Sequence, residues 1–186
     1  MSTKYEYNDT EILESYYIIS GDYTAQTIKP STAHVLTSVK FKGYRTGTIG
    51  PITISLLATS NGVPTGGSLA TGTYDGNLLP VSLNGVPPGG SAWFEVPMSS
   101  YTLQANTTYA LSIFCAEYGP GNYLDIKATS SGDPYPNGSV FYSTDGINWD
   151  EGGGNDILFE DWGDPEELVN YSRAFIPRMI MLHKGR

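Results

Sequence analysis

The sequence predicts an all-β fold, a single jelly-roll β-sandwich of about eight or nine strands with short N- and C-terminal arms. The composition is 39% hydrophobic and 16% charged, with 22 Gly and 12 Pro, which suits a turn-rich domain and does not suit a disordered chain. Fourteen tyrosines favour half-buried pleated strands. Turn signals also recur about every dozen residues between short alternating segments, as in sandwiches.

We expect three parts: an N-terminal arm over residues 1–24, the sandwich over 25–162 and a C-terminal arm over 163–186. In the first arm, residues 8–10 (NDT) can cap one helical turn that runs to Glu14. The apolar residues 16–19 (YYII) that follow must dock on this domain or on a neighbouring subunit.

The sandwich begins with a short strand that ends at Pro30. Residues 34–44 alternate, with Val39 and Phe41 on the face that we expect to be buried. Residues 108–116 carry apolar side chains on both faces, which predicts a strand in the middle of the sandwich. The other expected strands are residues 52–56, 69–74, 92–96, 123–128, 140–143 and 156–161.

The last two expected strands flank an Asp145-Gly146 pair that predicts a tight hairpin turn with positive φ at both positions. Trp149 and Trp162 lie in the same stretch, residues 138–162, which also holds six of the ten acidic residues found between positions 128 and 172. We interpret this stretch as the part that closes the sandwich.

The C-terminal arm changes character. Asp164 is a predicted N-cap, with Pro165 at the first helical position and Glu167 as in a capping box, for one or two turns. An apolar strand-like segment follows over residues 174–182. Residues 128–172 contain ten acids and no Lys or Arg, whereas residues 173–186 contain four basic residues and no acid. We therefore expect the arm to dock on an acidic surface, its own or a neighbour's, through Arg173, Phe175, Ile176, Arg178, Met179, Ile180, Met181, Leu182, Lys184 and Arg186.

Charge and hydropathy exclude several classes of partner. The formal net charge of −9 argues against nucleic acid, since a phosphate backbone requires a basic surface. No apolar run approaches the roughly 20 residues of a membrane-spanning helix, and the N-terminus lacks the apolar segment of a signal peptide. Cys115, the single cysteine, cannot form an internal disulfide and lies in an apolar strand pattern, as a buried small side chain would.

The sequence does not predict an enzyme. His34 and His183 are the two histidines, and neither belongs to a nucleophile motif. No zinc spacing and no phosphate-binding loop occur, so no cofactor is expected. A pair of carboxylates that catalyses glycoside hydrolysis is an alternative that the sequence leaves open, because Asp and Glu are abundant.

Calcium is the one candidate metal. Asp145, Asn148, Asp150 and Asp156 supply oxygen ligands within one hairpin, with Asn155 beside them, although the spacing is not that of an EF-hand. The alternative, which we favour, is that Asp145 and Asn148 bond to backbone groups of the turn.

Four aromatic residues near turns form a candidate sugar-binding platform: Trp149, Trp93, Tyr123 and Tyr135. The alternative is that these rings belong to the core, which is the usual place for tryptophan in a sandwich.

About three quarters of the chain resembles the jelly-roll module known as the choice-of-anchor R domain. The resemblance lies in these pieces, which stand in this order: residues 26–30 (QTIKP), 36–39 (LTSV), 44–47 (YRTG), 52–56 (ITISL), 62–66 (GVPTG), 69–73 (LATGT), 101–103 (YTL), 108–110 (TYA), 138–139 (GS), 143–149 (STDGINW) and 156–160 (DILFE). This family occurs in phage structural proteins and in prokaryotic surface proteins, and the resemblance implies a non-catalytic sandwich.

Family modules of the surface type usually follow a signal peptide and lie beside a wall or membrane anchor. This sequence shows neither feature, so we predict a structural virion protein. It would decorate a capsid or form part of a phage tail, would leave the cell by lysis, and would dock on other virion subunits or on its own copies through its arms. The alternative is a carbohydrate-binding module or adhesin domain of a surface protein, with glycans as partners.

Overall fold

A computed structural model describes residues 2–10, 22–82, 91–116, 120–129, 133–153 and 155–166, together with the backbone of residues 13–18. The described part is almost entirely β-structure, which confirms the predicted all-β sandwich. Its strands are β1 (Thr3–Asn8), β2 (Leu13–Ile18), β3 (Tyr23–Ile28), β4 (His34–Thr46), β5 (Pro51–Ser60), β6 (Val63–Asp75), β7 (Ala92–Leu103), β8 (Tyr109–Cys115), β9 (Tyr123–Thr129), β10 (Val140–Ser143), β11 (Asp150–Glu151), β12 (Asp156–Ile157) and β13 (Phe159–Pro165).

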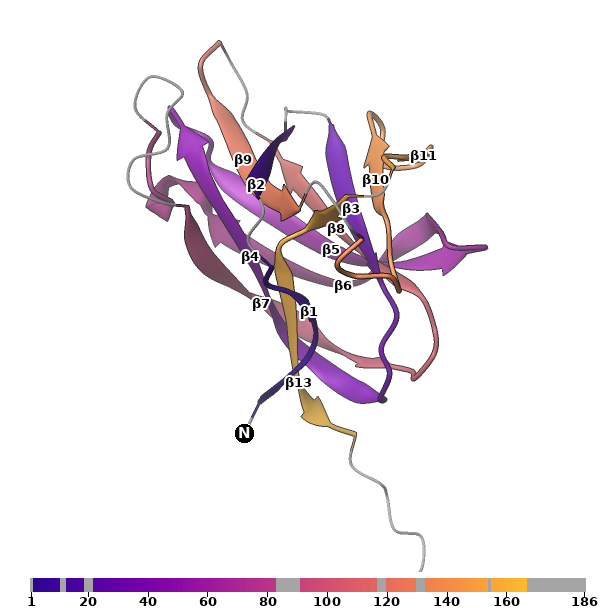
Figure 1. Cartoon of the computed structure of the whole chain (residues 1–186). Helices are drawn as coiled ribbons and strands as arrows, with labels where there is room; N and C mark the ends of the chain where they lie inside the picture. The colour runs from indigo at the N-terminus through magenta and orange to yellow at the C-terminus, as the bar shows by residue number, and fades with distance from the viewer. Residues whose placement is uncertain are drawn as a thin grey trace, which may run out of the picture.

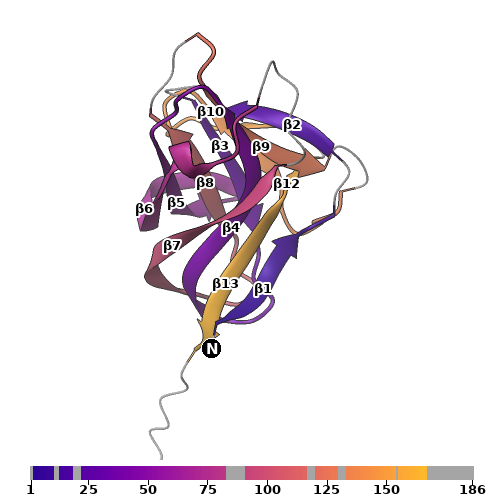
Figure 2. The ribbon, with the colours of Figure 1, turned by 90° about the vertical axis from the view of Figure 1, so that its left-hand side faces the viewer.

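Two antiparallel sheets form the sandwich (Figures 1 and 2). The first, sheet A, has the order β1-β13-β4-β9-β12, and in addition β7 pairs with β4 and β2 pairs with β9. The second, sheet B, has the order β11-β10-β3-β8-β5-β6. A 3-10 turn, η1 (Gly76–Leu78), follows β6. Strand β8 lies between β3 and β5, so the predicted central strand is confirmed.

The core lies between the two sheets. Val39 and Phe41 of β4 are fully buried, as the alternation predicts, and they face Ile54 of β5 and Ile113 of β8 within one continuous cluster. Cys115 is also buried in this cluster. Because side chains alternate along each strand, the residues between these positions point outward, and those of sheet B form the surface described below.

The N-terminal residues form two strands of sheet A, β1 and β2. β1 pairs with β13, and β2 pairs with β9. The predicted helical turn from Asn8 to Glu14 is therefore wrong, since Asn8 ends β1 and Glu14 lies in β2. The side-chain amide of Asn8 is buried and donates to the backbone oxygens of Asp156 and Ile157, so it joins strands rather than capping a helix.

The predicted helix start at Asp164 is also wrong, because Asp164 and Pro165 continue β13 and pair with Val35 and His34. Proline is tolerated there because the pairing of β13 with β1 reaches only to Gly163, so Pro165 lies where β13 is an edge among the described strands. The remaining residues of the predicted helix, the predicted strand-like segment and every predicted assembly residue fall within residues 167–186, which lie outside the described residues. Within the described residues, no helix has the length and apolar character needed to cross a membrane.

Candidate functional site

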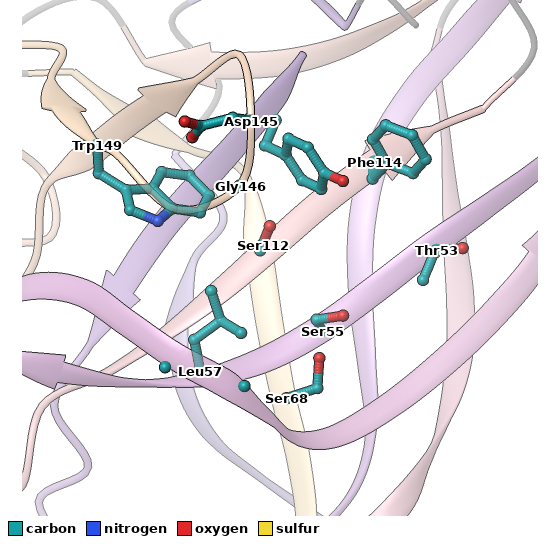
Figure 3. A pocket seen from close by; sticks show the side chains of 12 residues that line it. Thr53, Ser55, Leu57, Ser68, Ser112, Phe114, Asp145, Gly146 and Trp149 are labelled. Atoms are coloured by element: carbon teal, nitrogen blue, oxygen red, sulfur yellow. The ribbon is translucent and has the colours of Figure 1, made fainter. Parts of the chain in front are cut away.

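The outer face of sheet B carries a hollow of about 270 Å³ (Figure 3). Strands β5, β6 and β8 form its floor, and the loop of residues 144–149 between β10 and β11 overhangs one side. The hollow lies on the face opposite the core, so a ligand can enter it without any change in the packing of the sandwich.

The floor of the hollow is made of hydroxyl groups. Thr53 and Ser55 of β5, Ser112 of β8 and Ser68 of β6 line it. Ser55 and Ser112 are direct cross-strand partners, which places their hydroxyls side by side. No side-chain hydroxyl of these four residues has a hydrogen-bond partner among the described residues, although Ser112 is only 3% exposed.

Aromatic rings form the wall of the hollow. Tyr23 of β3 and Phe114 of β8 stack with their centroids 4.5 Å apart and an interplanar angle of 18°. Trp149 meets Tyr23 edge-on at 6.2 Å. Gly146 lies against the Tyr23 ring, where an added Cβ would come within 3.1 Å of a ring carbon, so glycine allows the loop to close over this residue. Figure 3 shows Ser112 between Trp149 on one side and Phe114 on the other.

Trp149 also anchors the loop to the sheet. It packs on an outer apolar cluster that is separate from the core and consists of Ala25, Leu57, Ala110 and Phe141. The indole Nε1 of Trp149 is buried and has no hydrogen-bond partner among the described residues. The ring is therefore held by apolar contact alone.

Asp145 fixes the shape of the loop. One carboxylate oxygen, Oδ1, accepts hydrogen bonds from the backbone N–H groups of Ile147 and Asn148, both at 2.8 Å, and Oδ2 accepts from the Asn148 amide at 2.7 Å. The bonds from Asn148 and Ile147 hold the pKa of Asp145 well below its ordinary value.

Of the two predicted turn positions, Gly146 alone has positive φ, so the predicted two-residue turn is wrong and the connection is a wider loop.

Two glycines widen the rim on β6. Leu57 pairs with Ser68 while the next residue, Ala58, pairs with Thr65, so residues 66–67 form a bulge without partners on β5. Gly66 has a φ of 76°, which glycine adopts without strain. Bulges of this kind redirect neighbouring side chains and are frequent beside binding sites.

The predicted sugar platform is not one surface. Trp149 lies at the hollow, but Trp93 and Tyr123 belong to strands of sheet A. Tyr135 is 5% exposed, packs edge-on against Phe159 and donates its hydroxyl proton to Glu6 Oε2 at 2.9 Å. Tyr135 is therefore a core residue, which agrees with the alternative interpretation that these rings pack in the core.

The structure also separates the predicted calcium ligands. Asp145 is engaged by its own loop, and Asp150 is exposed at the start of β11. Asp156 is buried and accepts hydrogen bonds from the Gln26 amide and from the backbone N–H of Tyr135. Among the described residues, no group of three His, Cys, Asp or Glu side chains is placed to hold a metal ion.

His34 is fully buried and paired with Asp161. Its Nδ1 lies 2.9 Å from the carbonyl oxygen of Thr32, and its Nε2 lies 2.9 Å from Asp161 Oδ2. Tyr5 stacks on the imidazole at 3.8 Å. With both partners at 0% exposure, the pair joins β4 to β13 and does not reach solvent. His183 lies outside the described residues.

Comparison with known proteins identifies no matching family model and no matching curated protein. Solved structures do match. One contains the cysteine protease and lectin-like domains of Cwp84, a surface-layer-associated protein of Clostridium difficile, with a TM-score of 0.57 and 14% identity over 88% of this chain. Another is the clostridial protease Cwp84 after propeptide cleavage, with a TM-score of 0.55 and 12% identity over 88% of this chain.

The chain spans 36% and 40% of the lengths of these two solved chains. At such low identity the likeness shows a shared fold. The chain therefore has a sandwich fold that also occurs in a surface-layer-associated protein with a lectin-like domain.

Proposed function

We propose that this chain is a non-catalytic carbohydrate-binding domain of a surface protein and that the hollow on sheet B is its binding site. The proposal depends above all on one observation: aromatic rings stand beside a floor of hydroxyl groups that have no hydrogen-bond partner among the described residues.

A sugar ring has the complementary chemistry. Its C–H groups pack on aromatic and aliphatic surface, for which Trp149 and Phe114 are available. Its hydroxyls donate and accept hydrogen bonds, as the serine and threonine hydroxyls also do. The floor consists of paired strands, so these groups are already positioned and binding does not have to order them.

The structural comparisons support this proposal in one respect. The matched protein carries a domain described as lectin-like, although its fold alone does not specify a ligand. The virion role and the choice-of-anchor R resemblance stay predictions. The virion role depends on residues 173–186, which lie outside the described residues.

Glycan binding can be tested on an array of neutral and acidic glycans, followed by calorimetry on the ligands found. In the double variant with Ser55→Ala and Ser112→Ala, we expect affinity to fall by about tenfold, the effect of losing one or two hydrogen bonds to a ligand. Stability should stay close to that of the wild type, because the removed hydroxyls have no hydrogen-bond partner in the part of the chain that the structure describes.

Ser60→Ala is the matched control, since Ser60 is an exposed serine at the end of the same strand and does not line the hollow. Equal losses in the control and in the double variant would contradict the proposal. So would the absence of binding to every glycan on the array.

We also expect neutral sugars to bind more tightly than acidic ones. Lys, Arg and His are absent from the described residues that line the hollow, and the ionised Asp145 stands at its rim. A ligand carboxylate near Asp145 should lower affinity by about fivefold to tenfold at low salt. The measurement is the affinity ratio of a hexose and its uronic acid in the wild type and in Asp145→Asn, which keeps the Oδ1 acceptor. The ratio should approach one in the variant, and tighter binding of the acid by the wild type would contradict this expectation.

A further inference from the structure

A second hollow, of about 400 Å³, lies on the same outer face of sheet B as the proposed binding site. Thr27 of β3, Thr108 just before β8 and Phe141 of β10 line it, together with the tip of the β5–β6 hairpin. We call it the far hollow, and the hollow beside Trp149 the near hollow.

Strand alternation places the two hollows on one face. On β3, Tyr23 lines the near hollow and Thr27 lines the far hollow, four residues along the same strand. Ser112 of β8 and Thr108, the residue just before β8, have the same spacing. An even spacing in a strand keeps side chains on one side of the sheet. At roughly 3.3 Å per residue, the two hollows are roughly 13 Å apart.

The region between the hollows is apolar. It is the outer cluster of Ala25, Leu57, Ala110 and Phe141, whose residues are at most 6% exposed and on which the half-buried Trp149 packs. Leu57 and Trp149 line the near hollow, and Phe141 lines the far hollow. A ligand that enters both hollows would therefore pass over the partly exposed ring of Trp149, which packs on this uncharged cluster.

The far hollow has polar groups suited to an uncharged ligand. The side-chain amides of Asn61 and Asn137 make no hydrogen bond within the described part of the chain. The charged residues among its described lining are one of each sign, Lys29 and Glu151, so their charges cancel. Amides of this kind both donate and accept, as sugar hydroxyls require.

We propose that the outer face of sheet B binds one extended neutral oligosaccharide, with sugar units in both hollows and at least one unit that passes over Trp149 between them. This inference rests on the proposed function and extends it from a single sugar to a chain. A peptide strand fits this face poorly, because β3, β8 and β5 are each paired on both sides and leave no edge for strand addition. A nucleic acid fits poorly too, because Lys29 is the single cation among the lining residues described.

The test uses the full chain and homologous series of one to six units of β-1,4-linked glucose, α-1,4-linked glucose and β-1,4-linked N-acetylglucosamine. For the series that binds, we expect affinity to rise by tenfold or more between one unit and four, then to level off. Two variants block the hollows separately. Ser68→Phe fills the near hollow from an exposed position on β6, and Thr108→Phe fills the far hollow.

Ser68→Phe should weaken the short and the long sugars alike by tenfold or more. Thr108→Phe should leave the short sugars unchanged and remove the gain from chain length. An affinity independent of length in the wild type, or a length gain that survives Thr108→Phe, would overturn the extended site while leaving the near hollow as a sugar site. If no series binds, the proposed function fails and this inference with it. Thermal unfolding of each variant within a few degrees of wild type shows that the fold is retained.

Discussion

Replacement of His34 by alanine should lower the free energy of unfolding by about 3–5 kcal/mol at neutral pH, the largest effect that we expect from a single substitution in this chain. The variant leaves the Asp161 carboxyl at 0% exposure without its partner and close to Glu6, whose charge further raises its pKa. It also removes the ring on which Tyr5 stacks. Chemical denaturation followed by tryptophan fluorescence measures the change.

The geometry of the pair also predicts how stability depends on pH. The carbonyl oxygen of Thr32 can only accept, so Nδ1 of His34 carries a proton. Nε2 and the Asp161 carboxyl then need one further proton between them to form their hydrogen bond. The folded pair therefore retains a proton that an unfolded histidine and aspartate release.

The pKa shifts of the two residues have the same direction. Burial by itself lowers the pKa of His34, but the hydrogen bond and charge of Asp161 and the Thr32 carbonyl outweigh it, so the pKa is raised above 6.5. Burial raises the pKa of Asp161, against the opposing effect of His34. Since the folded state holds the extra proton, its stabilising contribution is complete below pH 6.5 and is lost as the pH rises through the folded pKa of the pair.

We therefore expect stability to fall above pH 6.5 with a slope of at most about 1.4 kcal/mol per pH unit from this pair. Asp161→Asn is the matched variant, because an amide can donate to a neutral Nε2 without any additional proton. It should retain most of the stability at high pH and lose this part of the slope. An unchanged slope in Asp161→Asn, or a loss below about 1 kcal/mol in His34→Ala, would contradict the assignment.

Much of the fold follows from local pattern. Alternation over residues 34–44 correctly places Val39 and Phe41 in the core, and the two apolar faces of residues 108–116 correctly indicate a central strand. The errors lie where tertiary contacts override local signals. Asp164 and Pro165 form a good helix start in isolation, but pairing with β4 extends β13 through both residues.

The candidate site was harder to predict because its parts are far apart in the sequence. Trp149 was visible beside a turn, whereas Tyr23, Ser55 and Ser112 belong to three different strands whose pairing no local pattern specifies. The sequence does contain one indication of the site, the alternation of hydroxyl and apolar residues in β5. Thr53 and Ser55 alternate with isoleucine, which indicates a strand whose outer face carries hydroxyl groups. Nothing in the sequence shows that this face carries a hollow.

Trp149→Ala should reduce affinity for the bound glycan by about thirtyfold, a typical effect for a tryptophan at the centre of a binding surface. Two contributions combine here. The ligand loses the largest ring at the near hollow, and the loop of residues 144–149 loses its contact with the cluster of Leu57, Ala110 and Phe141. Calorimetry measures the first effect and thermal unfolding the second.

Trp149→Phe separates these contributions. The indole Nε1 of Trp149 has no partner among the described residues, so phenylalanine removes no hydrogen bond and keeps an apolar ring on the cluster. Stability should then stay near wild type, while affinity falls by a smaller factor because the ring surface is reduced. Trp93→Ala, on sheet A, should leave affinity unchanged. Equal affinity losses in Trp93→Ala and Trp149→Ala would place the ligand elsewhere. A loss confined to Trp149 links binding to the face where aromatic rings meet hydroxyl groups that have no hydrogen-bond partner among the residues described.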